Sequence, residues 1–308
     1  MNKIPETQLE PIQLKRLAAQ RQLYSDAKFI QAAQIKLSVL VPLILTVLVA
    51  CRLIPSVWSA ICGIIVACLF LVFDSRQKSL KAKAAKIQEL FDCAVLELDW
   101  RELMVGSQSE NEIVETYASK HKGEDPDYLK LRNWYSKNVG KLPLHLGRLV
   151  CQRSNCWWDS QLRRRYAKWV IGTLAALLIV VVTCFGLTTD FTLEKRILLE
   201  KFVLLVVNPL TPAFILAIRQ RTENIGSAVR LDKLKEHTED VWNKALAGAN
   251  SEEVTRTSRE LQDEIYHHRR TNSLIFDWFY NLLKKEDEEQ VNKTTDELVN
   301  EALKVLKK

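Results

Sequence analysis

The sequence lacks the short motifs by which the common enzyme classes are recognised. No phosphate-binding loop, dinucleotide-binding glycine motif, nucleophile elbow or zinc-protease motif occurs among its 308 residues. The adjacent histidines His267 and His268 are more typical of a helix surface than of a site. Neither a catalytic residue nor a metal site is therefore predicted, although an enzyme that uses other residues stays open as an alternative.

Cysteines are few and scattered, and strand-like patterns are missing. The 7 cysteines are an odd number, so no disulfide framework is expected. Cys151 and Cys156 lack a second pair of Cys or His at ligand spacing, which argues against zinc. The alternation within residues 94–100 continues a helical stripe and does not predict a strand. The pattern as a whole is that of an all-α protein.

Long stretches without a charge are the main feature of the chain. Residues 37–51 and 57–73 are apolar throughout, and only the proline-containing turn 52–56 separates them. With flanking residues each reaches the roughly 20 residues that a helix needs to cross a hydrocarbon core. The pattern recurs at residues 169–187 and 202–218. We therefore predict an all-α membrane protein with four transmembrane helices in two hairpins plus a helical cytoplasmic domain.

Lysine and arginine gather on one side of these predicted spans. They cluster at residues 76–86 and 163–168, whereas the turn 52–56 holds only Arg52. The positive-inside rule then places both termini and the central segment in the cytoplasm, where the basic residues also contact anionic lipid headgroups. The predicted organisation is an N-terminal cytoplasmic helix (1–34), a first transmembrane hairpin (35–73), a cytoplasmic helical region (74–168), a second transmembrane hairpin (169–218) and a C-terminal cytoplasmic helical region (219–308).

The two ends of the chain carry weaker signals. Residues 1–6 are expected to be loose, and an amphipathic helix from about Thr7 is expected to run into the first span. The stripe through Val254, Leu261 and Ile265 predicts a packed helix near the other end. A short last helix with its cap at Thr294 is expected to follow it.

The predicted fourth span contains an amide and two prolines. Asn208, Pro209 and Pro212 lie near its middle, where each proline removes a backbone hydrogen bond. One interpretation is a kink of the kind that membrane helices tolerate. The other is a hinge or pore-lining element, because irregular backbone at membrane depth occurs where it lines a cavity.

Several polar and aromatic clusters do not fit the sequence pattern of a simple amphipathic helix. Those that carry a family resemblance are Gln152-Arg153-x-Asn155-x-x-Trp158-Asp159, Leu261-Gln262-Asp263-Glu264-Ile265-Tyr266 with Arg269, Asp277-Trp278-Phe279-Tyr280, Phe91-Asp92, Trp100 and Trp134-Tyr135. With them the chain resembles the membrane effectors associated with SMODS-type nucleotidyltransferases, the four-transmembrane effector family of bacterial cyclic-oligonucleotide anti-phage (CBASS) systems. The resemblance covers nearly the whole chain, and the first cluster carries most of its specificity.

The resemblance implies a function that composition does not show. Such a protein is a multi-pass effector of the bacterial inner membrane, activated by a cyclic di- or trinucleotide that a partner nucleotidyltransferase makes. It then damages the membrane and stops the infected cell before phage mature. Four spans are too few to enclose a wide aqueous path, so a homo-oligomer is expected. No cofactor and no nucleic-acid polymer are expected to bind.

A cyclic nucleotide needs cations for its phosphates and flat side chains on which its bases stack. The candidate ligand-binding residues are Arg153, Asn155, Trp158, Arg163, Trp134, Tyr135, Tyr266 and Arg269. The opposing interpretation is structural, with Arg153–Asp159 and Arg269–Asp277 as ion pairs and the aromatic side chains as core. A membrane-anchored scaffold that binds a protein partner and a membrane enzyme also stay open as functions.

Overall fold

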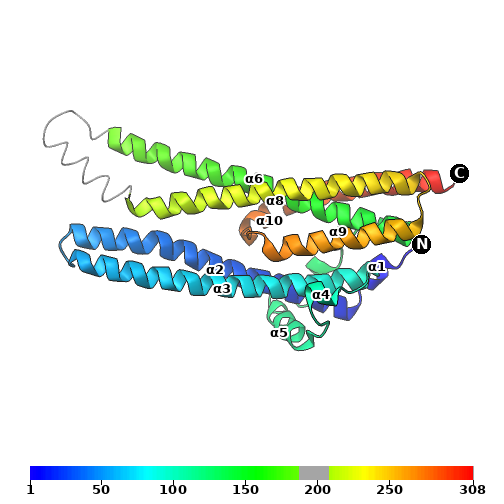
Figure 1. The fold of residues 1–308 in the computed structure, drawn as a ribbon, viewed down its shortest axis with the longest axis horizontal. Helices are drawn as coiled ribbons and strands as arrows, with labels where there is room; N and C mark the ends of the chain where they lie inside the picture. Colours follow the sequence, from blue (N-terminus) through cyan, green and yellow to red (C-terminus); the bar gives the residue numbers. More distant parts are fainter. Residues whose placement is uncertain (187–207, 308) are drawn as a thin grey trace. The chain divides into compact units, whose positions relative to one another are not determined.

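The computed structural model describes residues 1–186 and 208–307, and these contain helices and no β-strand (Figure 1). The α-helices are α1 (Ile4–Thr7), α2 (Pro11–Ala50), α3 (Ser56–Val95), α4 (Glu102–Val105), α5 (Asn111–His121), α6 (Leu144–Gly186), α8 (Asn208–Leu246), α9 (Ser251–Thr271) and α10 (Asp277–Leu306). Two short 3₁₀ helices, η1 (Leu129–Leu131) and η2 (Lys137–Lys141), precede α6. The all-helical prediction is thus confirmed for the described residues.

The chain forms two compact units. Unit 1 comprises Met1–Ala27, Lys78–Arg163 and Gly226–Lys308, and unit 2 comprises Lys28–Gln77 and Arg164–Ile225. The long helices α2, α3, α6 and α8 each contribute residues to both units.

In unit 2, the end of α2 and the beginning of α3 form an antiparallel hairpin (Figure 1). The turn between them spans residues 51–55 and includes Arg52 in the left-handed region at φ 58°. The side-chain amide of Gln34 donates to the carbonyl oxygen of Phe70 at 3.2 Å, which joins the two helices. Two prolines have the usual placement, Pro11 at the start of α2 and Pro55 immediately before α3, whereas Pro42 lies inside α2.

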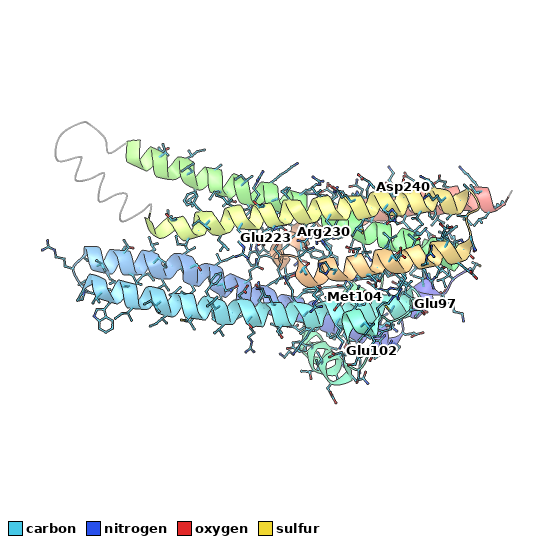
Figure 2. All side chains as sticks on the ribbon, in the orientation of Figure 1. Glu97, Glu102, Met104, Glu223, Arg230 and Asp240 are labelled. Atoms are coloured by element: carbon cyan, nitrogen blue, oxygen red, sulfur yellow. The ribbon has the colours of Figure 1, made fainter. Side chains whose placement is uncertain are left out.

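The apolar side chains of this hairpin project outward and do not form a core (Figure 2). Pro11–Val49 and Ala60–Val95 are long and apolar enough to cross a membrane, and the most apolar window of the second segment holds no buried residue. The exposed side chains include Leu40, Ile44, Val47, Ile61, Ile64, Ile65, Leu69, Leu71 and Val72. Such a surface suits lipid, because soluble monomers rarely expose a continuous apolar patch of this kind.

The second predicted hairpin falls partly outside the described residues. Residues 187–207 hold the end of the predicted third span, the turn after it and the start of the fourth span. The described remainder lies in α6 and α8, where the exposed side chains include Ile171, Leu178, Ile179, Val182, Ile215 and Ile218.

Unit 1 has a conventional buried core, and α9 shows how the sequence builds it. Val254, Leu261, Ile265 and His268 are each at most 3% exposed, at spacings of seven, four and three residues. This is the predicted stripe, and it is confirmed. The helix starts where the side chain of Asn250 accepts a hydrogen bond from the backbone N–H of Glu252.

The N-terminus is ordered, so the prediction that residues 1–6 are loose is wrong. The side chain of Asn2 donates to the carbonyl oxygens of Val139 and Leu142 at 2.8 and 2.9 Å. Ile4 is completely buried. The partners lie more than a hundred residues away along the chain, so local composition carries no sign of them.

The prediction of a short last helix is also wrong. α10 is one helix of 30 residues, and Thr294 lies inside it. The Thr294 hydroxyl donates to the carbonyl oxygen of Gln290, four residues earlier, at 3.0 Å. A threonine that bonds in this way satisfies its hydroxyl within a helix and does not cap one.

Candidate functional site

The centre of unit 1 holds buried polar side chains from α3, α6 and α9. We call this set the central polar network, and its members are Glu89, Asp92, Gln152, Ser258, Arg259, Gln262 and Arg269. Helical periodicity places these side chains on the faces that also carry the apolar core, so the network lies inside the packing and not at its edge.

Two carboxylates are the most demanding members of this network. Glu89 and Asp92 lie three residues apart on α3, and both are completely buried. Arg259 pairs with Glu89 at 2.7 Å, and Arg269 pairs with Asp92. Arg259 also pairs with Asp263 at 2.7 Å, so the two guanidinium groups face three carboxylates. Removing one partner of such a buried pair costs about 3–5 kcal/mol, because a charge is left buried and uncompensated.

Amide side chains complete the network and join the helices. The Gln262 amide donates to Glu89 at 2.8 Å and to Asp92 at 3.0 Å. The Gln152 amide of α6 donates to the carbonyl oxygen of Ser258, whose hydroxyl donates back to the Gln152 oxygen at 2.9 Å. Because both ends of each amide are used, the registers of α3, α6 and α9 are fixed relative to one another within unit 1.

Tyr135 attaches the segment before α6 to the same carboxylates. Its hydroxyl donates to Asp92 at 2.7 Å and accepts from the Asn155 amide at 3.0 Å. Its backbone N–H donates to the Gln8 side chain at 2.8 Å. Burial, together with the nearby negative charge of Asp92, raises the pKa of the Tyr135 hydroxyl well above its usual value. The hydroxyl is therefore a fixed donor at any physiological pH.

A second polar group surrounds Asp159. Its carboxylate lies 3.1 Å from Arg163 and 2.9 Å from Nε2 of His268. Burial favours the neutral carboxyl, but the charge of Arg163 and the hydrogen bond from His268 prevail and lower the pKa of Asp159 well below its usual value. His268 is 1% exposed, and its Nδ1 has no hydrogen-bond partner. Burial consequently lowers the pKa of the imidazole, because a protonated ring would leave that N–H unsatisfied.

Cations also close the carbonyl ends of two helices in unit 1. The Lys81 ammonium donates to the carbonyl oxygens of Thr271 and Asn272 at the end of α9. Arg148 donates to the carbonyl oxygens of Leu96 and Glu97 at the end of α3. Glu97 itself is exposed, as its labelled side chain shows (Figure 2). Positive charge at a helix C-terminus is favourable, so these contacts strengthen the frame around the network.

The structure distributes the predicted ligand-binding residues over different environments. Tyr135, Asn155 and Arg269 contact one another or Asp92, as described above. Tyr266 is buried against Ala85 and Val105. Trp134 is half-buried and meets Phe91 edge-on, with ring centroids 6.2 Å apart.

The ion pairs that the structural interpretation named have other partners. Arg153 pairs with Glu239 of α8 at 2.7 Å and not with Asp159. Arg269 pairs with Asp92 and not with Asp277, whose carboxylate accepts from the Ser25 hydroxyl at 2.9 Å. Both named ion pairs are therefore wrong: the two arginines are paired, but with carboxylates on helices distant in the sequence.

Two residues near Trp158, namely Tyr280 and Arg21, are not among the ligand-binding residues that the sequence predicted. The rings of Trp158 and Tyr280 lie 6.2 Å apart at an angle of 41°. The Arg21 guanidinium lies over the Tyr280 ring at 5.2 Å from its centroid. Tyr280 belongs to a cluster that the sequence did single out, whereas no local pattern distinguishes Arg21 from other arginines on amphipathic helices.

The residues predicted as a hinge or pore lining lie in α8. Pro212 is inside this helix, and its side chain is exposed. Asn208 and Pro209 have helical backbone, but their side chains lie outside the described part of the structure. Among the residues that the structure describes, no group of three or more His, Cys, Asp or Glu side chains is placed to hold a metal ion.

Comparison with known proteins identifies a family. Residues 2–298 match the family described as "SMODS-associating 4TM effector domain". A curated protein of Bacillus cereus (strain VD146), named as a probable CBASS effector molecule, is 25% identical over 285 residues, which cover 89% of this chain and 91% of that protein. No solved structure matches the chain.

Proposed function

Because the chain belongs to the family of SMODS-associating 4TM effector domains, we propose that it is the membrane effector of a bacterial CBASS anti-phage system. The match over residues 2–298 carries this proposal, and it confirms the resemblance that the polar and aromatic clusters indicated. The name of the Bacillus cereus relative points the same way. In this role the activating ligand is a cyclic di- or trinucleotide from a partner nucleotidyltransferase, and the target is the inner membrane.

In the proposed arrangement four helices cross the membrane as two hairpins and unit 1 lies in the cytoplasm. The exposed, charge-free surfaces of α2 and α3 support the first hairpin. The basic clusters at residues 76–86 and 163–168 support the orientation. In intact spheroplasts an external protease should leave both termini and residues 74–168 uncut, and cleavage there would contradict the orientation.

The central polar network provides a route for the signal. It joins α3, α6 and α9 through buried side chains that hydrogen-bond to one another. Because α3 and α6 also supply residues to unit 2, a ligand that moves either helix in unit 1 would act on a helix of the proposed membrane part. Packed, fully bonded cores switch between arrangements and do not deform gradually, which favours an on–off response.

The membrane lesion is proposed to form between chains. Cyclic symmetry is the usual way in which identical chains surround an axis. α8 is the proposed lining element, since Pro212 leaves a carbonyl without its helical donor and Asn208 adds an amide that is unfavourable in lipid. Hydration of these groups on opening would let water and solutes pass.

The decisive experiment reconstitutes the full chain in vesicles of phosphatidylethanolamine and phosphatidylglycerol loaded with a self-quenched dye. Cyclic di-AMP, cyclic di-GMP, cyclic GMP–AMP and cyclic tri-AMP are added in turn, and dye release is compared with that of empty vesicles. Release with one cyclic nucleotide and not with its linear form supports the proposal. Binding without release would favour a scaffold, and conversion of the nucleotide, seen by mass spectrometry, would favour an enzyme.

A further inference from the structure

Three partly exposed side chains from separate helices meet on unit 1: Arg21 of α2, Trp158 of α6 and Tyr280 of α10. Tyr280 is shared, because Arg21 lies over its ring at 5.2 Å and the Trp158 ring lies 6.2 Å from it. The three helices are far apart in the sequence, so the cluster exists only in the folded unit. We call it the Arg21–Trp158–Tyr280 cluster.

Arg21 differs from the arginines that the sequence favoured as phosphate ligands. Arg153 and Arg163 each pair with a carboxylate, at 2.7 and 3.1 Å. Arg269 pairs with the buried Asp92. Using any of them for a phosphate would break an existing ion pair. Within the described residues no carboxylate pairs with Arg21, which contacts the Tyr280 side chain.

A guanidinium stacked on a ring keeps its N–H groups available at its edge. Cation–π contact holds the plane of the group, while phosphate is bound in that plane by two parallel hydrogen bonds. Arg21 is thus held against the Tyr280 ring without being neutralised by a carboxylate. Its half-buried position raises the strength of such a bond relative to a fully solvated arginine.

The two rings supply the flat surface that a base requires. Their angle of 41° means that they are not stacked face to face, so neither ring covers the other. Both side chains are partly exposed. An aromatic face of this kind binds any base, and each such stack contributes about 5- to 150-fold in affinity.

We propose that the Arg21–Trp158–Tyr280 cluster binds one nucleotide unit of the cyclic oligonucleotide, with its base against the Trp158–Tyr280 pair and its phosphate on Arg21. This inference rests on the proposed function, since it assigns the site at which that ligand acts. Burial raises the pKa of the Tyr280 hydroxyl, and the nearby carboxylates of Glu288 and Asp277 add to this effect. Their negative charge disfavours a long polyanion, so the site suits a small ligand better than a nucleic-acid polymer.

The cluster is also tied to the rest of unit 1. Trp158 adjoins Asp159, which contacts Arg163 of the same helix and His268 of α9. Tyr280 lies one turn after Asp277, whose carboxylate accepts a hydrogen bond from the Ser25 hydroxyl of α2. A base that displaces either ring would therefore act on α2, α6 and α9, and of these α6 and α9 carry members of the central polar network. The site and the route of the signal are contiguous within one unit.

The test measures nucleotide binding by the full chain in lipid nanodiscs with isothermal titration calorimetry. The probes are cyclic di-AMP, cyclic di-GMP, cyclic GMP–AMP and cyclic tri-AMP, each against the wild-type protein first. For the nucleotide that binds, Arg21→Ala and Trp158→Leu should each weaken affinity by about tenfold or more. Tyr280→Phe keeps the ring and should change affinity by less than about threefold, whereas Tyr280→Ala should lower it as Trp158→Leu does.

The matched controls remove the same kinds of side chain elsewhere on unit 1. Trp157→Leu alters the adjacent tryptophan on another face of α6, and Arg230→Ala removes an exposed arginine of α8 (Figure 2). Both should bind like the wild type, and circular dichroism should show every variant helical. If the wild type binds a probe and Arg21→Ala binds it equally well, the assigned site is wrong while the proposed function stands. If the wild type binds none of the probes, the proposed ligand class fails and the site with it.

Discussion

Arg269 of α9 and Asp92 of α3 form an ion pair in which the carboxylate is completely buried and the guanidinium side chain is 11% exposed. The same carboxylate accepts hydrogen bonds from Tyr135 and Gln262 at 2.7 and 3.0 Å. Three elements of unit 1 therefore depend on one side chain. Loss of its ion-pair partner, Arg269, should therefore affect all three elements.

Arg269→Ala should lower the free energy of unfolding by about 3–5 kcal/mol, because it leaves Asp92 charged and without its cation. The adjacent Arg270 is exposed, and Arg270→Ala should change stability by no more than about 0.5 kcal/mol. Thermal unfolding in detergent, followed by circular dichroism, compares the two. Equal midpoints would mean that the pair contributes little to stability.

His268 should make stability depend on pH. Burial, only partly opposed by Asp159, holds the pKa of its imidazole below the usual value, so the unfolded chain takes up a proton more readily than the folded one. The free energy of unfolding should thus fall as pH drops below about 6.5, by at most about 1.4 kcal/mol per pH unit. The charged groups that face the ring are Asp159, Arg163 and Arg269.

His268→Gln should remove this part of the pH dependence between about pH 6.5 and 5. His267→Gln, which alters the exposed neighbour, is the control and should keep it. Burial also lowers the pKa values of His121 and His145, so the difference between the variants is the informative quantity. Parallel curves for the two variants would show that His268 does not titrate in this range.

Gly147→Ala should destabilise the protein, although alanine is the better helix former. A Cβ at residue 147 would lie 2.6 Å from the Asn2 amide nitrogen and 3.2 Å from Cδ1 of Ile4. The Asn2 amide cannot move aside without losing its two carbonyl partners. A loss of about 1–3 kcal/mol is expected in chemical denaturation.

The control for this substitution is Gly226→Ala in α8, where a Cβ meets no atom within 4 Å. That change should leave stability unchanged or raise it by up to about 1 kcal/mol, the usual advantage of alanine in a helix. A stabilising effect at both glycines would show that the N-terminal segment yields to the added methyl group.

The prolines of α8 should matter for the lesion and not for binding. Replacing Pro209 and Pro212 with leucine restores helical donors and should reduce nucleotide-dependent dye release, while calorimetric binding stays the same. Pro42 lies inside α2 and serves as the control, because it too removes a helical donor but lies outside α8. If Pro42→Leu reduces release as much, helix straightening in general is responsible, and α8 has no special role.

The sequence by itself determined the features that depend on local periodicity and composition. Charge-free runs at residues 37–51 and 57–73 specify apolar helices whose surfaces are exposed, because only lipid accepts such stretches without a core. The stripe of α9 was likewise predictable, since its spacing repeats that of packed helices. The polar and aromatic clusters were enough to indicate the family.

Tertiary structure alone decided which polar side chains meet. Arg269 and Asp92 are 177 residues apart, and Arg153 and Glu239 are 86 apart, so no spacing rule relates them. Asn2 orders an end of the chain that composition describes as loose, through carbonyls that only the fold brings near. Arg21 became distinct from other surface arginines only when α10 placed the Tyr280 ring beneath it. Pairing of buried charges is decided by three-dimensional proximity, because an unpaired charge is too unfavourable in the core to stay without a partner wherever the chain supplies one.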